Sequence, residues 1–224
     1  GGAEASVADF ARFDCAEGLA DHHFLERVAA PANQAQFQRK VHKEWASLRK
    51  NLPETIWVRC YEERTDLLRV AIAGAPGTPY DDGLYFFDIC LPGTYPADPP
   101  EAYYHSRGLR INPNLYENGR VCLSLLNTWT GKGSEMWHPA SSTILQLLVS
   151  IQGLVLVPKP YFNEAGYERQ MGSPEGEKNA LVYNESAFLL CVKTMVNVMH
   201  DPPEHFEPLV RAHFRHRGRR ILAC

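Results

Sequence analysis

Several features are absent from this sequence, and each absence argues against a class of protein. No run of about 18 apolar residues occurs in the 224 residues, so the sequence predicts no helix that crosses a membrane. No apolar leader follows the first residues, so secretion is not expected. Basic and acidic residues nearly balance, with 23 Lys and Arg against 26 Asp and Glu. A dedicated nucleic-acid-binding protein is usually clearly basic, so we expect no nucleic-acid partner.

The six cysteines are too scattered for a zinc site or a disulfide framework. No two of them have the Cys-x-x-Cys spacing, so we predict no metal. So few thiols along such a chain favour a reducing compartment, the cytoplasm or the nucleus. Cys60 and Cys90 end strand-like runs, and we interpret both as small buried apolar residues. The chain begins Gly-Gly without a methionine, so we expect a fragment of a longer protein.

Hydrophobic periodicity predicts one helix followed by an antiparallel meander. Asn33 suits a helix N-cap, and apolar residues then recur at spacings of three or four as far as Leu48. The proline-rich stretch 92–100 cannot be central strand or helix interior, so it is expected to be a rigid extended connector. Strand-like runs separated by short turn-rich joints occupy residues 55–60, 67–73 and 84–91.

The second half of the chain is predicted to be mostly helical. Residues 140–157 are nearly all apolar after a Ser/Thr start, which predicts a central buried helix capped by Ser141 or Ser142. A second helix is expected over 181–200 and a third after Asp201 as N-cap. This order predicts an α+β fold with helices on one face and at the ends of one sheet. The expected divisions are an N-terminal extension over 1–32, a core over 33–200, and a C-terminal helix and tail over 201–224.

Cys122 lies in a segment of a different kind. Residues 112–126 read Asn-Pro-Asn-Leu-Tyr-Glu-Asn-Gly-Arg-Val-Cys-Leu-Ser-Leu-Leu, so the cysteine follows Asn114 by eight residues, beyond a turn-like Glu-Asn-Gly. A buried structural cysteine needs no such approach, whereas a nucleophile does. Arg120 could favour the thiolate, although a solvated arginine is the commoner arrangement. No histidine occurs between Ile111 and Met136, so the segment offers no Cys–His pair.

Three blocks in this order resemble the catalytic domain of ubiquitin-conjugating enzymes, the E2s. The resemblance extends from about Gln34 to His200. It implies the UBC fold, a four-stranded antiparallel meander with an N-terminal helix, a central helix and C-terminal helices. The blocks are a strand with its proline-rich connector at 78–100, the active-site segment at 112–126, and a Trp-x-Pro-Ala turn with the central helix at 137–155.

The sequence departs from most E2s in two places. Most read His-Pro-Asn where this chain has Asn112-Pro113-Asn114, so we expect the turn to form through a different side-chain bond. The insertion 127–136 resembles the large hybrid E2/E3 enzymes, and most closely the plant phosphate-homeostasis members of that group. We expect a flap beside Cys122, with Trp129 packed on the domain and Lys132 outward, a candidate for self-ubiquitination.

The resemblance implies transthiolation followed by acyl transfer. Cys122 would receive ubiquitin as a thioester from an activating enzyme, the E1, and present it to a substrate lysine. Asn114 would stabilise the oxyanion or order the loop; satisfying the backbone of a turn is the ordinary alternative. Glu164 would help to activate the lysine, unless desolvation by Tyr161 and Phe162 lowers the pKa of the amine instead.

The resemblance also implies partners. These are ubiquitin, an E1, substrates that include phosphate transporters and exporters at endomembranes, and either an E3 or a second copy; no cofactor is implied. Lys40 and Lys43 would equally suit a solvated helix face. Gly153 costs about 1 kcal/mol against Ala within a helix, which favours a close contact there. The expected surfaces are an E3-type surface at Leu91, Pro92, Pro139 and Ala140, an E1-type surface at Lys40 and Lys43, and a donor-ubiquitin contact at Val149 and Gly153.

Two other functions remain open from the sequence. One is a catalytically silent E2-like module that binds ubiquitin or serves as a ligase scaffold. Such modules usually lack the cysteine, whereas Cys122 is present at its spacing from Asn114. The other is a cysteine hydrolase of unrelated fold, which would need a buried histidine partner for the cysteine.

Overall fold

The computed structural model describes residues 6–129, 131 and 133–223, and its centre is a five-stranded sheet. Neighbouring strands in the chain are also neighbours in the sheet, in the order β1-β2-β3-β4-β5. β1 pairs with β2 in parallel, and the remaining pairs are antiparallel. The strands are β1 (Phe13–Ala16), β2 (Ile56–Tyr61), β3 (Leu67–Ala73), β4 (Leu84–Cys90) and β5 (Glu101–Tyr104).

The structure confirms the α+β class and the meander, and it corrects the strand count. The three predicted strands are present within one residue at either end. The additional edge strand is β1, which lies in the N-terminal segment and pairs with β2 in the register Cys15 with Cys60. Its four residues carry no alternating apolar pattern, and the strand forms because β2 supplies its hydrogen-bonding partners. The expected domain divisions stay predictions.

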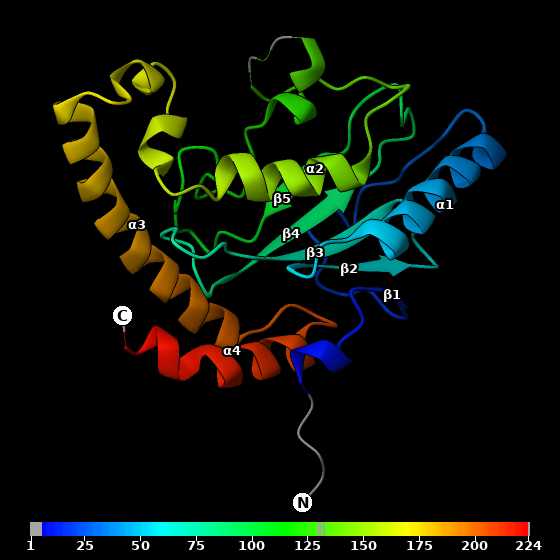
Figure 1. Cartoon of the computed structure of the whole chain (residues 1–224). Coiled ribbons are helices and arrows are strands. Elements are labelled where there is room, and N and C mark those ends of the chain that lie inside the picture. The colour runs from blue at the N-terminus through cyan, green and yellow to red at the C-terminus, as the bar shows by residue number, and fades with distance from the viewer. Residues whose placement is uncertain (1–5, 130, 132, 224) are drawn as a thin grey trace, which may run out of the picture.

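Helices cover both faces of the sheet, which corrects the expectation of helices on one face and at the ends only (Figure 1). α1 and α2 lie over one face, where Val41 and Leu147 share an apolar core with Val70 of β3. α4 lies under the opposite face, where Phe206 and Phe86 meet in a second core. Every residue of β2, β3 and β4 is therefore buried. The helices are α1 (Gln34–Asn51), α2 (Ile144–Ser150), α3 (Pro174–His200) and α4 (Glu207–Ile221).

The first two helices begin at side-chain caps. Asn33 caps α1 as predicted, because its Oδ1 accepts a hydrogen bond from Gln36 N at 3.0 Å. The predicted cap of the central helix was wrong. Thr143 caps α2 by accepting from Gln146 N at 3.1 Å. Ser142 is not available, since its buried hydroxyl accepts from His138 N at 2.9 Å in the preceding turn.

The last two helices differ from their predicted bounds. α3 begins at Pro174 behind the cap Ser173, well before the expected residue 181. α4 begins at Glu207 rather than after Asp201, which instead follows the end of α3 and pairs with Arg107 at 2.6 Å. No described helix is long and apolar enough to cross a membrane.

A buried ion pair attaches the N-terminal segment to the sheet. Arg69 of β3 and Asp88 of β4 are both fully buried, with Nε and Oδ1 2.7 Å apart. Arg69 also pairs with Asp21 of the N-terminal segment. The neighbouring His22 donates from Nε2 to the Leu68 carbonyl at 3.0 Å. These bonds hold the segment against the face of the sheet that α1 and α2 leave uncovered.

Candidate active site

The active-site segment begins at Asn112, which is buried and hydrogen-bonded through both ends of its side chain. Nδ2 donates to the Tyr80 hydroxyl and to the Val155 carbonyl, each at 2.7 Å. Oδ1 accepts from Asn114 N at 2.8 Å. The prediction that this asparagine would form the turn through side-chain bonds of its own is therefore confirmed.

The end of the central helix supplies free carbonyl groups for this contact. α2 continues into a π-helical turn, Ile151–Val155, in which Leu156 N donates to Ile151 O at 3.2 Å. The last carbonyls of a helix lack partners within it. Asn112 donates a hydrogen bond to the Val155 carbonyl. Asn163 donates to Leu154 O at 3.2 Å and to Val155 O at 3.3 Å. Segments far apart in sequence therefore meet at this helix end.

Asn114 and Cys122 hold each other by two hydrogen bonds. Cys122 N donates to Asn114 O at 2.9 Å, and Asn114 Nδ2 donates to Cys122 O at 2.8 Å. The amide nitrogen has a second N–H. The Oδ1 atom of Asn114 is buried and has no protein partner within the described residues. The side chain orders the loop around the cysteine in this conformation and retains unused hydrogen-bonding capacity.

Thr128 fixes the chain on both sides of Cys122. Its hydroxyl accepts from Leu123 N at 2.9 Å and donates to Val121 O at 2.8 Å. The preceding Asn127 has a left-handed backbone, with φ 54°, which turns the chain back toward the cysteine. Thr128 was not predicted, although a Ser/Thr side chain next to an asparagine is a turn signal.

Cys122 itself is only 2% exposed. Burial and the neighbouring Cys122 thiol raise the pKa of Tyr116. Arg120 is exposed and lies over the Tyr116 ring, so the interpretation of Arg120 as a solvated side chain is confirmed. Cys60 and Cys90 are buried in the sheet as predicted, and burial raises the pKa of the Cys90 thiol to about 12.

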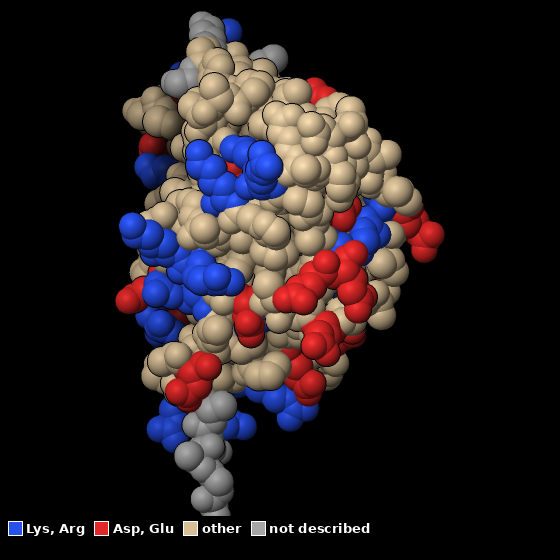
Figure 2. All heavy atoms as spheres, turned by 90° about the vertical axis from the view of Figure 1, so that its right-hand side faces the viewer, with Lys and Arg blue, Asp and Glu red and all other residues tan. Residues whose placement is uncertain are grey.

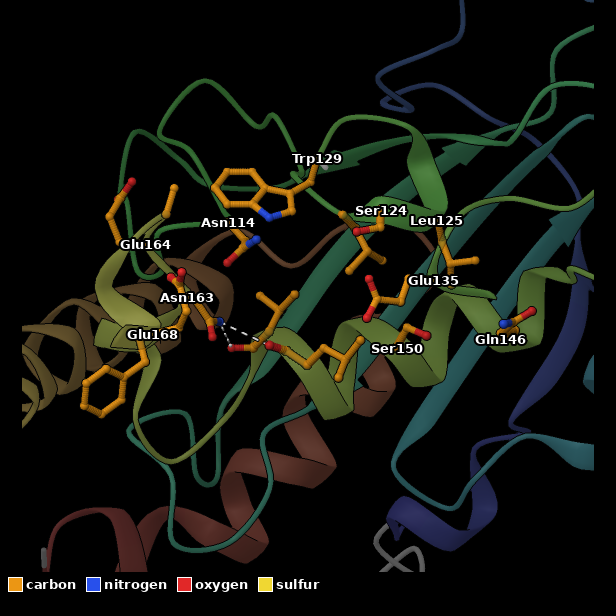
Figure 3. A pocket seen from close by; sticks show the side chains of 15 residues that line it. Asn114, Ser124, Leu125, Trp129, Glu135, Gln146, Ser150, Asn163, Glu164 and Glu168 are labelled. Carbon is orange, nitrogen blue, oxygen red and sulfur yellow. Dashed lines mark hydrogen bonds between the residues drawn. The ribbon is translucent and has the colours of Figure 1, made fainter. Parts of the chain in front are cut away.

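A hollow of about 510 Å³ lies beside Asn114 (Figure 3). Trp129 of the insertion lies across the hollow from α2, as Figure 3 shows, and this half-buried ring packs against the domain. Lys132, expected to point outward, lies outside the described residues. The hollow is lined by Asn114, Leu123, Ser124, Leu125, Trp129, Glu135, Gln146, Ser150, Leu154, Val155, Phe162, Asn163, Glu164, Ala165 and Glu168.

The hollow brings Glu164 near Asn114, as the sequence suggested. The Glu164 carboxylate is partly exposed and lies 3.6 Å from Arg110 Nη2. Phe162 also lines the hollow, whereas Tyr161 does not. The Tyr161 hydroxyl donates to Gln170 Oε1 at 3.1 Å, and the part of this ring in desolvating a lysine stays a prediction.

Two further carboxylates line the hollow and were not predicted from the sequence. Glu135 comes from the insertion and Glu168 from the 3₁₀ helix Tyr167–Gln170. Neither position carries a motif, and only the folding of the two loops over α2 brings them together. The hollow therefore combines amide, aromatic and acidic groups, which suits a cationic amine.

The expected donor-ubiquitin face is open. Val149 of α2 and Leu154 of the π turn are both exposed. A Cβ added at Gly153 would have open space within 4 Å, so no contact within the chain explains this glycine. Leu154 was not predicted, and its 62% exposure makes it the most prominent apolar residue there.

The expected E3-type surface is partly corrected. Leu91 is fully buried and cannot contact a partner. It continues the inward-facing alternation of Phe87 and Ile89, and its N–H donates to Asp66 O at 2.8 Å. Pro92 is half-buried. Pro139 and Ala140 are exposed.

The two lysines of the expected E1-type surface have different surroundings. Lys40 is mostly buried and pairs with Glu44 at 2.9 Å. Glu44 also accepts from the Tyr95 hydroxyl at 2.9 Å and from Ile144 N at 3.0 Å, so it joins α1 to the start of α2. Lys43 is exposed.

The side of the molecule at the right of Figure 1 carries acidic side chains beside separate basic groups (Figure 2).

No described group of three or more His, Cys, Asp or Glu side chains is arranged to hold a metal ion.

A family model described as "Ubiquitin-conjugating enzyme" matches residues 40–187. The "Probable ubiquitin-conjugating enzyme E2 23" of Arabidopsis thaliana is 59% identical over 99% of this chain and 20% of its own length. The "Putative ubiquitin-conjugating enzyme E2 38" of the same plant is 53% identical over 99% of this chain and 68% of its own length. The "Dual E2 ubiquitin-conjugating enzyme/E3 ubiquitin-protein ligase BIRC6" of Homo sapiens is 39% identical over 91% of this chain and 4% of its own length. The chain thus spans 20% to 34% of the length of three Arabidopsis relatives, "E2 23" among them.

Proposed function

The chain belongs to the ubiquitin-conjugating enzyme family, and from that premise we propose that it carries ubiquitin as a thioester on Cys122 and transfers it to lysine. The observation that supports this most directly is the pair of hydrogen bonds between Asn114 and Cys122 beside a hollow lined with carboxylates. These bonds hold the Cys122 backbone beside Asn114, which lines the hollow together with Leu123.

Both steps of the reaction transfer the ubiquitin acyl group from one nucleophile to another, and neither step needs an oxidant. The Cys122 thiolate attacks the thioester carbonyl of E1-bound ubiquitin, and the E1 thiolate leaves. A lysine amine then attacks the new thioester, loses a proton, and the Cys122 thiolate leaves. A thiolate serves both steps because it is a good nucleophile and a competent leaving group. Since the incoming acyl group is already activated, a histidine base for the cysteine is unnecessary.

Asn114 is proposed to act in both loop order and chemistry. One N–H of its amide holds the Cys122 carbonyl at 2.8 Å. The second N–H can donate to the oxyanion that forms on the thioester carbonyl, and such donors are typically worth about a hundred- to a thousand-fold in rate.

Glu164 and Phe162 are proposed to prepare the acceptor lysine. An unperturbed lysine has a pKa of about 10.4, so little of it is neutral at pH 7. Glu164 can accept the proton that the attacking amine loses, and Phe162 excludes water from the same hollow. Val149 and Gly153 remain the proposed donor-ubiquitin face, and Pro92, Pro139 and Ala140 the proposed E3 face.

Combined E2 and E3 activity is proposed from the human relative that is named a dual enzyme. The expected partners are ubiquitin and an E1. The E1 is expected to bind through Lys43 and the partly covered Lys40. Phosphate transporters and exporters are proposed substrates on the earlier family resemblance alone. The sparse, scattered cysteines favour the cytoplasm or the nucleus, and we propose a peripheral place at endomembranes only through these substrates.

The silent-module alternative is less favoured, because Cys122 is held in place by Asn114 and Thr128. A cysteine hydrolase is also less favoured, since none of the described histidines is hydrogen-bonded to Cys122.

Incubation with E1, ATP and ubiquitin tests the proposal. We expect a band heavier by one ubiquitin that disappears on reduction. Cys122→Ala should abolish the band, and Cys122→Ser should leave either an oxyester that resists reduction or no product. Cys60→Ser and Cys90→Ser are matched controls and should load normally. Loading of Cys122→Ala at the normal rate would end the proposal.

A further inference from the structure

α3 carries two apolar faces, and only one of them is covered. Buried residues such as Ala187 and Cys191 face the domain. The opposite side of the helix lies at the edge of the molecule, away from the sheet (Figure 1). Its exposed apolar residues, called here the α3 stripe, are Leu181, Val182, Phe188, Leu189, Val196 and Met199.

The α3 stripe is continuous along the helix. Val182, Leu189 and Val196 recur every seven residues and so return to nearly the same side of an α-helix. They span about 21 Å at 1.5 Å per residue. Scattered single apolar residues on a surface need no explanation, whereas a continuous exposed row marks an interaction site.

Two charged residues lie along the stripe with no ion-pair partner in the described part of the chain. Glu185 is four residues before Leu189, and Lys193 is four residues after it. Both side chains are exposed. Their positions are symmetric about Leu189, as are those of Val182 and Val196.

We propose that the α3 stripe binds the same stripe of a second copy of this chain, with the two helices antiparallel and a two-fold axis at Leu189. This arrangement places Val182 level with the partner's Val196. It also places Glu185 level with the partner's Lys193, and the symmetry makes each contact twice.

The symmetry of charge and apolarity about Leu189 favours a second copy over an unrelated partner. A two-fold axis at Leu189 matches apolar with apolar side chains and acid with base. Helices that cross at about 50° diverge away from the crossing point, so contact is confined to the region between Val182 and Val196. Lys178 and the partner's His200, which lie level beyond that region, separate into solvent.

The expected association is weak and reversible. One pair of crossing helices buries less than the roughly 1,200 Å² of a stable interface. We therefore expect a dissociation constant on the order of 10 µM. No residue of the stripe lines the hollow beside Asn114, so the proposal is independent of the Cys122 chemistry.

Sedimentation equilibrium of the 224-residue chain from about 1 to about 300 µM tests the proposal, because this range brackets the expected constant. The weight-average mass should rise from that of the 25.3 kDa monomer toward twice that value. Leu189→Asp should weaken association at least about tenfold, because it places two carboxylates together at the axis. Met171→Asp is the matched control, since Met171 is 62% exposed against 63% for Leu189 and lies outside α3.

Swapping the charges of Glu185 and Lys193 tests whether the partner is a second copy of this chain. Glu185→Lys and Lys193→Glu should each weaken association, since each places like charges level. The double variant should restore it, because the pairs are re-formed with reversed sign. Monomeric wild type across the range, an equal effect of Met171→Asp, or a double variant no better than the singles would overturn the proposal. Unchanged thermal unfolding shows that each variant is folded.

Discussion

The Asn112 side chain donates to the Val155 carbonyl at 2.7 Å and so connects the active-site segment to the π-helical end of the central helix. The contact matters because Asn112 also fixes Asn114, whose N–H donates to Asn112 Oδ1 at 2.8 Å. The chain of bonds runs from Val155 through Asn112 and Asn114 to Cys122. The position of the cysteine is thereby tied to the helix that carries the proposed ubiquitin face.

Replacing Asn112 tests this connection. Asn112→Ala should lower the free energy of unfolding by about 2–4 kcal/mol, because it leaves the Asn114 N–H buried without its partner and removes the shorter of two hydrogen bonds to the Val155 carbonyl. Urea unfolding measures the effect. Asn118→Ala is the control, since Asn118 is exposed in the same segment and should change stability by less than about 1 kcal/mol. Equal losses in both variants would contradict the role assigned to Asn112.

Local signals in the sequence were sufficient for much of this fold. Asn33 caps α1 as predicted, and the three middle strands were located by their β-branched and aromatic runs. Some signals were present and missed. Ser173, Pro174 and the acidic residues that follow are a helix start, and the alternation of Phe87, Ile89 and Leu91 predicts that Leu91 is buried.

Other features depend on contacts between distant segments. β1 is a strand only because β2 pairs with it, and its own four residues do not indicate one. Glu135 and Glu168 meet at the hollow because two loops fold over α2. Ser142 appeared to be a helix cap, but the turn before the helix uses its hydroxyl. Such competition for a side chain cannot be seen in a local sequence window.

His22 should make stability fall on acidification. Burial lowers its pKa below the ordinary 6.5, although Asp88 opposes this shift. The neutral ring donates from Nε2 to Leu68 O and accepts at Nδ1 from Phe24 N at 3.2 Å, so protonation breaks the second bond. The unfolded chain takes up the proton first as pH falls below 6.5, and stability drops by at most about 1.4 kcal/mol per pH unit for this group.

Urea midpoints at a series of pH values from 7.5 down to 5, chosen to bracket the ordinary histidine pKa, measure this dependence. His22→Gln should have a shallower slope than wild type, while the exposed His42→Gln should keep the wild-type slope. A residual slope is expected, because burial also lowers the pKa of His213. An unchanged slope in His22→Gln would show that its ring does not titrate differently in the folded state.

Trp129 should matter more for transfer than for folding. Its half-buried ring lines the hollow with Asn114. Trp129→Ala should leave thioester formation on Cys122 near normal and slow discharge to lysine by about threefold to tenfold, because the amine loses a wall that positions it. Gel assays of loading and discharge separate the two steps. A loss of more than about 4 kcal/mol in stability would instead place Trp129 in the core. Unchanged stability and discharge would make the insertion a passive surface loop.

Asn114→Ala should separate the two proposed parts of the reaction. If the second N–H of Asn114 stabilises the oxyanion during attack by lysine, loading should proceed while single-turnover discharge slows by about a hundredfold or more. If the residue acts only by holding the Cys122 carbonyl, the misplaced thiol should slow loading and discharge alike. Asn118→Ala is again the control and should be normal in both steps. Discharge of Asn114→Ala at the wild-type rate would rule out both the oxyanion role and positioning of the thiol through the Cys122 carbonyl.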